Sequence, residues 1–138
     1  MNPLPKDWRE TAQRIQTEVN ALPYKSDPER YGKREFWEHI DAQGGDCEDY
    51  AIGKLNALHE LGFPIERLRL ATCMVGWRDT QYQEGHAVLV LDAPDDHYVL
   101  DNRFPSLVPV SHLIGSGYSL DRIQKVGGSR EWIKWVHN

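Results

Sequence analysis

The 138-residue chain is 40% hydrophobic and 27% charged, and its formal net charge at pH 7 is -5. This composition suffices for a single folded domain over residues 1–138 and excludes a wholly disordered chain. The sequence has no basic cluster, which argues against nucleic acid as a partner, and no apolar run of about 18 residues, which argues against a membrane-spanning helix.

The first half of the sequence has the spacing of helices. Apolar residues recur at intervals of three and four between residues 7 and 22, which predicts a helix that Pro23 ends; they are Trp8, Ala12, Ile15, Val19 and Leu22. Residues 24–32 contain proline and glycine and are predicted to form a loop. Residues 36–40 indicate a short second helix.

The clearest predicted helix begins at Asp46, directly after two glycines. An aspartate at this position can cap the amide groups of the first turn. One face of the helix is mostly apolar and consists of Cys47, Tyr50, Ala51, Leu55, Leu58 and Leu61. Gly62 suits a left-handed C-terminal cap, and Pro64 prevents the helix from continuing.

The second half is rich in valine, leucine and aromatic residues, which is typical of strands. Strands are predicted at 67–77, 86–91, 98–102, 107–110 and 118–123, whereas 131–136 fits either a strand or a helix. Helices followed by consecutive strands indicate an α+β fold with an antiparallel sheet.

Cys47 is the first candidate for chemistry. The chain has two cysteines, fewer than the disulfide framework of a small secreted domain usually contains. We therefore expect one functional thiol and one buried apolar thiol, Cys73. At the start of a helix, the amide groups and the helix dipole favour the thiolate, which is the nucleophilic form. A small buried residue on an apolar helix face explains Cys47 equally well at this stage.

His86 and Asp101 are candidates for the partners of that thiol. His86 is predicted to begin a strand, where it could act as general base and general acid. Asp101 ends the predicted strand YVLD and could orient the imidazole through its Nδ1–H. A solvated histidine and a turn aspartate before Asn102 are the alternatives.

Three carboxylates, Asp46, Glu48 and Asp49, surround Cys47 in the sequence. They fit helix capping, but their charges would disfavour a neighbouring thiolate unless they point away or a cation neutralises them. Calcium is a cation with the required preference for oxygen ligands. Gln43 and Trp37 could each donate a side-chain N–H to an oxyanion, and Trp37 fits core packing or a partner contact better.

Four blocks of the sequence carry a more specific signal. They are GGDCEDYAIGKLNAL (44–58), LGFPIERLRL (61–70), HAVLVL (86–91) and VLDN (99–102). In this order, they closely resemble the bacterial transglutaminase-like cysteine proteinases, over about residues 19–118. The resemblance implies a papain/transglutaminase-like fold, in which the catalytic cysteine begins a helix that packs on an antiparallel sheet.

The resemblance also implies residue roles. It makes Cys47 the nucleophile, His86 the base and Asp101 the third member of a catalytic triad. In adhesin-releasing members of the family, acidic residues beside the cysteine bind calcium, which here implies Asp46, Glu48 and Asp49. A tryptophan ten residues before the cysteine contacts a regulatory protein in those members, and Trp37 occupies that position.

The chain departs from the adhesin-releasing members in two respects. It shows neither an export signal nor their longer N-terminal helical region, and in this it is similar to short forms found in phage and prophage regions. As written, the sequence is expected in the cytoplasm; if it is a piece of a longer protein, the periplasm is expected. We do not expect an organic cofactor.

The function predicted from these residues is hydrolysis of a peptide bond in a protein substrate through an acyl-enzyme. Acyl transfer to an amine is an alternative, because the same triad would carry it out. A calcium-responsive binding module that retains the scaffold without catalysis is a second alternative.

Overall fold

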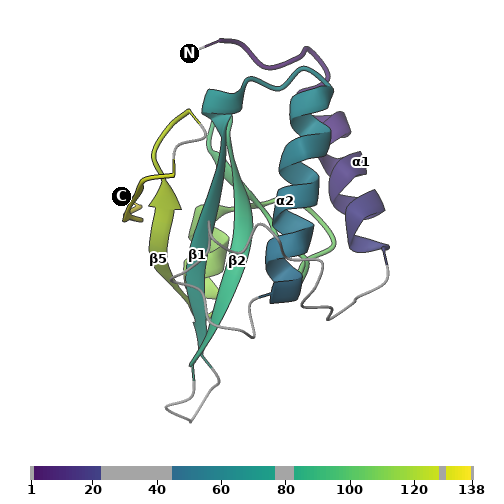
Figure 1. The fold of residues 1–138 in the computed structure, drawn as a ribbon. Helices are drawn as coiled ribbons and strands as arrows, with labels where there is room; N and C mark the ends of the chain where they lie inside the picture. Colours follow the sequence, from purple (N-terminus) through teal and green to yellow (C-terminus); the bar gives the residue numbers. More distant parts are fainter. Residues whose placement is uncertain (1, 23–44, 77–82, 128–129, 138) are drawn as a thin grey trace.

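The computed structural model describes residues 2–22, 45–76, 83–127 and 130–137, and the side chains of 45, 46, 83 and 84 are not among the described parts. Two helices and a six-stranded sheet make up most of the described chain (Figure 1). The predicted α+β class is confirmed.

The two predicted long helices are present. Helix α1 spans Trp8–Asn20 and helix α2 spans Gly45–Glu60. Gly62 has a φ of 97°, in the left-handed region that its predicted capping role requires. Leu22 and Leu61 were assigned to the apolar faces of the two predicted helices. Each lies beyond the end of its helix and is exposed. The predicted helix at 36–40 lies outside the described residues.

The strands form one antiparallel sheet in the order β4-β3-β2-β1-β5-β6. A 3-10 turn at Ile65–Arg67 leads into the first strand. The strand bounds are β1 Leu68–Gly76, β2 Gln83–Asp92, β3 His97–Leu100, β4 Val108–Pro109, β5 Tyr118–Gln124 and β6 Trp132–Lys134. The ambiguous tail therefore contains a short strand.

One predicted strand is shorter than expected. Of residues 107–110, only Val108 and Pro109 form a strand, and Val110 begins helix α3, Val110–Gly115. Two residues of this helix, Val110 and Leu113, are buried against the sheet. This burial outweighs the local preference of a valine-rich segment for a strand.

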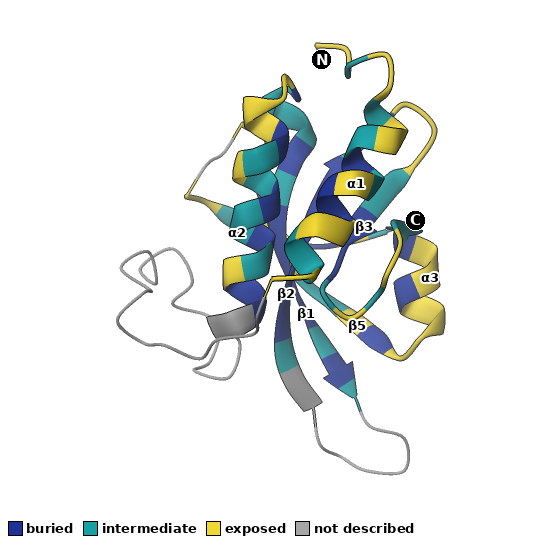
Figure 2. Ribbon diagram, turned by 90° about the vertical axis from the view of Figure 1, so that its right-hand side faces the viewer, coloured by how far each residue is buried: buried dark blue, intermediate teal, exposed yellow. Residues whose placement is uncertain are grey.

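The sheet separates two apolar cores. On one face α2 packs on β1 and β2, and α1 packs beside α2 (Figures 1 and 2). On the other face α3 covers side chains from β1, β2, β3 and β5. No helix among the described residues is long and apolar enough to cross a membrane.

Candidate active site

Cys47 lies at the point where the first turn of α2 meets β2. Its side chain is buried, and its Sγ accepts a hydrogen bond from the backbone N–H of Ala87 at 3.2 Å. Strand β3 ends at Leu100, which pairs with Leu89, so the β2 edge at Ala87 lies beyond this pairing. The Ala87 amide has no β3 partner at this point and donates to the Cys47 sulfur instead of to a neighbouring strand.

His86 precedes this amide in β2. It was predicted to begin the strand, but β2 begins at Gln83, so His86 is its fourth residue. Its Nε2 lies 2.6 Å from Oδ1 of Asp101. The prediction that Asp101 binds Nδ1 was therefore wrong. With Nε2 occupied, Nδ1 is the ring nitrogen left for Cys47, with which the imidazole also forms a hydrogen bond.

Asp101 directly follows β3 and is fully buried. Its Oδ1 accepts hydrogen bonds from His86 and, at 2.9 Å, from the backbone N–H of Arg103; its Oδ2 accepts one from the Tyr118 hydroxyl at 2.7 Å. Burial alone would raise the pKa of this carboxyl. The hydrogen bonds and the charge of His86 outweigh burial and hold the pKa below its usual value.

The imidazole of His86 is shifted in the opposite direction. Burial by itself would lower its pKa, because it penalises the charged ring. The hydrogen bonds to Asp101 and Cys47, together with their negative charges, raise the pKa of His86 to about 9. At neutral pH the site therefore favours an imidazolium between a carboxylate and a sulfur.

Two further residues of the site were not predicted. Tyr118 is buried, and its ring meets the His86 ring edge-on, with 6.0 Å between centroids. Lys54 lies two turns after Cys47 in α2, is fully buried, and its Nζ has no hydrogen-bond partner among the described residues. Burial lowers the pKa of Lys54 to about 8, although the charge of Asp101 opposes this shift.

Amide side chains on α1 also reach the site. Gln16 and Asn20 donate to the backbone carbonyl oxygens of Asp101 and Phe104. Both lie in the helix that was predicted from its apolar residues. Two amide side chains one helical turn apart could have indicated a hydrogen-bonding role. The sequence does not reveal which distant carbonyl groups they bind.

The second cysteine is a buried thiol, as predicted. Cys73 in β1 pairs with His86 in β2, and its thiol donates to the His86 carbonyl oxygen at 3.5 Å. Burial raises the pKa of Cys73 well above its usual value, and nearby negative charges add to the shift. This thiol is therefore poorly suited to act as a nucleophile.

The predicted calcium ligands are only partly described. Glu48 is buried and Asp49 is exposed, and consecutive helix positions do not face each other. The side chain of Asp46 lies outside the described parts, as do Trp37 and Gln43. Within the described ranges, no group of three or more histidine, cysteine, aspartate or glutamate side chains could hold a metal ion.

Solved structures with a similar fold come from Legionella pneumophila LapG. The calcium-bound form has a TM-score of 0.61 and 21% identity, over 93% of this chain and 74% of that chain. A second LapG structure gives 0.61 and 23%, over 91% and 69%. The EGTA-treated form gives 0.61 and 21%, over 88% and 66%. These likenesses confirm the predicted fold.

The sequence itself was also compared with known families. No curated protein matches the chain. Residues 2–138 match the family described as bacterial transglutaminase-like cysteine proteinase. The predicted resemblance is confirmed over nearly the whole length. The chain belongs to the bacterial transglutaminase-like cysteine proteinases, a family of cysteine peptidases.

Proposed function

We propose that this chain hydrolyses a peptide bond of a protein substrate with Cys47 as nucleophile, His86 as proton carrier and Asp101 as the residue that orients His86. The observation that carries the proposal is the continuous chain of contacts from the sulfur through the imidazole to a buried carboxylate. These groups come from α2, β2 and the end of β3, so only the folded chain brings them together.

The reaction begins from a thiolate beside an imidazolium. Sγ of Cys47 attacks the scissile carbonyl carbon, and the carbonyl oxygen becomes an oxyanion. Amide N–H groups at the first turn of α2, including that of Cys47, are the proposed donors to this oxyanion. As the C–N bond breaks, Nδ1 of His86 gives its proton to the leaving amine, and the acyl group remains on the sulfur.

Hydrolysis of the acyl-enzyme restores the starting state. The neutral imidazole takes a proton from water, whose oxygen attacks the acyl carbon. The C–S bond then breaks, the carboxylic acid leaves, and the thiolate again faces an imidazolium. Throughout the cycle Nε2 keeps its hydrogen bond to Asp101, which stabilises the ring whenever it is charged.

The proposal is tested by comparing cleavage products in a bacterial proteome. The wild type is expected to produce new peptide N-termini that Cys47→Ala does not produce. Cys73→Ala is the matched control, because it removes the other thiol and should cleave like the wild type. New termini that also appear with Cys47→Ala, or their absence with every variant, would contradict the proposal.

A labelled amine added to the same reactions separates hydrolysis from acyl transfer. With hydrolysis the label stays in solution, and each new N-terminus has a matching free carboxylate. Incorporation of the amine into glutamine side chains, without new termini, would assign the same three residues to transfer instead.

We further propose that calcium binds at the start of α2 through Asp46 and Glu48. Asp49 is exposed and does not face Glu48, so it is left out of this ligand set. Support comes from Glu48, a buried carboxylate in this turn, and from the similar LapG structure described as calcium-bound. Carboxylates are preferred calcium ligands. Bound calcium would neutralise charge beside the thiolate, and the described residues alone do not complete its coordination shell.

Calcium binding has a readout that does not need a substrate. A cation that binds only the folded state raises the melting temperature as its concentration increases. We expect calcium to raise the melting temperature of the wild type and of Asp95→Asn, an exposed control on the β2–β3 turn, and not that of Glu48→Gln. An equal rise in all three proteins would place the calcium elsewhere.

A further inference from the structure

Tyr118 is the first residue of β5, the strand that pairs with the opposite edge of β1 from β2. Seventeen residues separate it from Asp101, yet its hydroxyl donates to Oδ2 of that carboxylate at 2.7 Å. The side chain is only 6% exposed. A hydrogen bond from a buried hydroxyl to a buried carboxylate is charge-assisted, and it is stronger than a hydrogen bond between neutral groups.

The contact restricts how the Asp101 carboxylate can turn. Oδ1 is held by Nε2 of His86 and by the Arg103 amide, and Tyr118 holds Oδ2. With donors on both oxygens, rotation of the carboxylate would break hydrogen bonds that no water replaces at a fully buried position. The Tyr118 hydroxyl thus helps to keep Oδ1 aimed at the imidazole.

Tyr118 also contacts the ring that Asp101 orients. Its ring is edge-on to His86 at an interplanar angle of 73°. The Phe104 ring, 5.9 Å away between centroids, and the Arg103 guanidinium also lie beside it. Burial and the nearby carboxylate raise the pKa of Tyr118 far above its ordinary value. The phenol therefore stays neutral, and its hydroxyl remains a donor to Asp101.

We propose that Tyr118 is a positioning residue of this site, whose hydroxyl keeps Asp101 ionised and aimed at His86. The inference rests on the proposed catalytic roles of Cys47, His86 and Asp101. It differs from a packing role, because packing would need the aromatic ring and not the hydroxyl. Removing the oxygen atom alone therefore separates the two roles.

The test compares Tyr118→Phe with Tyr98→Phe. The Tyr98 hydroxyl donates to Oδ2 of Asp95 at the same distance, 2.7 Å, but at the exposed β2–β3 turn. The two variants thus lose the same kind of hydrogen bond. The readout is the rate at which iodoacetamide alkylates Cys47 at each pH, followed by mass spectrometry of the Cys47 peptide, which needs no peptidase substrate.

In Tyr118→Phe, the carboxylate keeps two of its three donors, so Asp101 takes up a proton at higher pH. A neutral Asp101 no longer stabilises the imidazolium of His86, and the alkylation of Cys47 that this imidazolium supports slows. We expect the acid limb of the alkylation profile to move up by about one pH unit, the size of shift that one hydrogen bond to a carboxylate produces. Tyr98→Phe is expected to follow the wild type.

A double variant tests whether Tyr118 acts through Asp101. Once Asp101→Asn has removed the titrating carboxylate, adding Tyr118→Phe should leave the alkylation profile unchanged. Equal alkylation profiles for the wild type and Tyr118→Phe would overturn the proposal. It would also be overturned if Tyr118→Phe shifted the profile of Asp101→Asn as much as it shifts that of the wild type.

Should Tyr118→Phe fail to fold, proton NMR of the wild type still decides. A slowly exchanging hydroxyl proton of Tyr118 is expected at neutral pH and should be lost as Asp101 titrates; no such signal would overturn the proposal. The peptidase proposal can fail separately. If Tyr118→Phe shifts the alkylation profile but the proteome comparison yields no new N-termini, the peptidase proposal is contradicted and the role of Tyr118 is not.

Discussion

Nε2 of Gln16 in α1 donates to the backbone carbonyl oxygen of Asp101 at 2.8 Å, across 85 residues of sequence. The same nitrogen donates to Phe104 at 2.8 Å, and Asn20 donates to Phe104 at 3.1 Å. One turn earlier, Gln13 binds the carbonyl oxygen of Pro105 and the amide of Leu107. A polar face of α1 thus fixes the chain that leaves β3, and with it the base of the Asp101 side chain.

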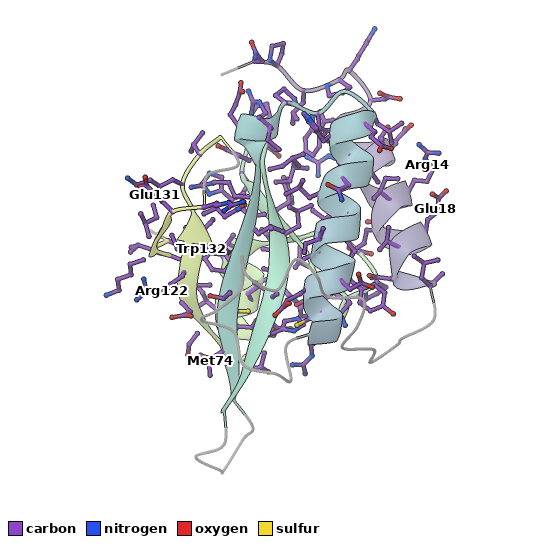
Figure 3. All side chains as sticks on the ribbon, viewed as in Figure 1. Arg14, Glu18, Met74, Arg122, Glu131 and Trp132 are labelled. Atoms are coloured by element: carbon purple, nitrogen blue, oxygen red, sulfur yellow. The ribbon has the colours of Figure 1, made fainter. Side chains whose placement is uncertain are left out.

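Gln16→Leu should lower the free energy of unfolding by about 1–2 kcal/mol, because one buried and one partly buried carbonyl group lose a donor, while Asn20 still donates to both. Urea denaturation measures this loss. Arg14→Leu is the control on the same helix. Arg14 points outward beside Glu18 (Figure 3), its ion pair is exposed, and a change within about 0.5 kcal/mol is expected. Equal losses in the two variants would show that the buried amide is dispensable.

Asp101→Asn should reduce kcat/KM by a factor on the order of 100 or more, because the imidazolium loses the negative charge beside it while the shape of the side chain is kept. Cleavage at a site found in the proteome comparison provides the measurement. Asp95→Asn is the matched control, since Asp95 also accepts a hydrogen bond from a tyrosine but lies on the surface. A rate for Asp101→Asn within twofold of the control would remove Asp101 from the mechanism.

His86 should make stability depend on pH. Its folded-state pKa of about 9 lies above the ordinary 6.5, so the folded chain binds the proton more tightly than the unfolded chain. The contribution of His86 is complete below pH 6.5 and disappears as the pH rises through 9. Urea denaturation of wild type and His86→Gln should therefore give a difference that is largest near pH 6 and declines by pH 9.5.

His112→Gln is the control for that experiment. His112 is exposed on α3 and contacts only the edge of the Phe104 ring among the described aromatic pairs. His112→Gln shows how much of any change between pH 6.5 and 9 comes from removing a histidine at the surface. A difference between wild type and His86→Gln that stays constant across this range would contradict the raised pKa.

Lys54→Met should stabilise the chain at neutral pH. The folded pKa of about 8 lies below the ordinary 10.5, so protonated Lys54 destabilises the fold by roughly 3 kcal/mol at pH 7. Methionine fills similar space without a charge, although losing the attraction to Asp101 offsets part of the gain. We expect a net increase of about 1–3 kcal/mol.

The gain from Lys54→Met should shrink as the pH rises from 8 to 10.5. Over this window Lys54 is largely neutral in the folded chain and still protonated in the unfolded chain, so the stability of the wild type rises with pH. Lys134→Met, at an exposed position on β6, is the control for removing a lysine charge. A less stable Lys54→Met at pH 7 would mean that the ammonium makes favourable contacts that exceed the effect of burial.

The sequence predicted what local patterns determine. Spacing and the Gly62 cap located both long helices, and strand-like composition located β1, β2 and β5. The motifs around Cys47, His86 and Asp101 selected three side chains that the fold brings into contact. Their catalytic roles remain a proposal.

Contacts between distant segments were beyond the sequence. Nothing local distinguishes Gln16 or Tyr118 from other polar residues of a helix or a strand end, because their partners lie across the fold. Lys54 shares a face of α2 with Cys47 and Leu58, so helical spacing was compatible with its burial. It was missed because a lysine is ordinarily solvated. The ring nitrogen of His86 that meets Asp101 likewise depends on the start of β2 and the end of β3.

The residues that donate hydrogen bonds to Asp101 are translated at widely different times. Gln16 leaves the ribosome early, His86 and Asp101 much later, and Tyr118 last. A nascent chain that has not yet reached β5 lacks the hydroxyl on Oδ2, and its β1 lacks a neighbour along one edge. The full set of donors to Asp101 is thus assembled only after β5 has joined the sheet, late in the order in which these residues are made.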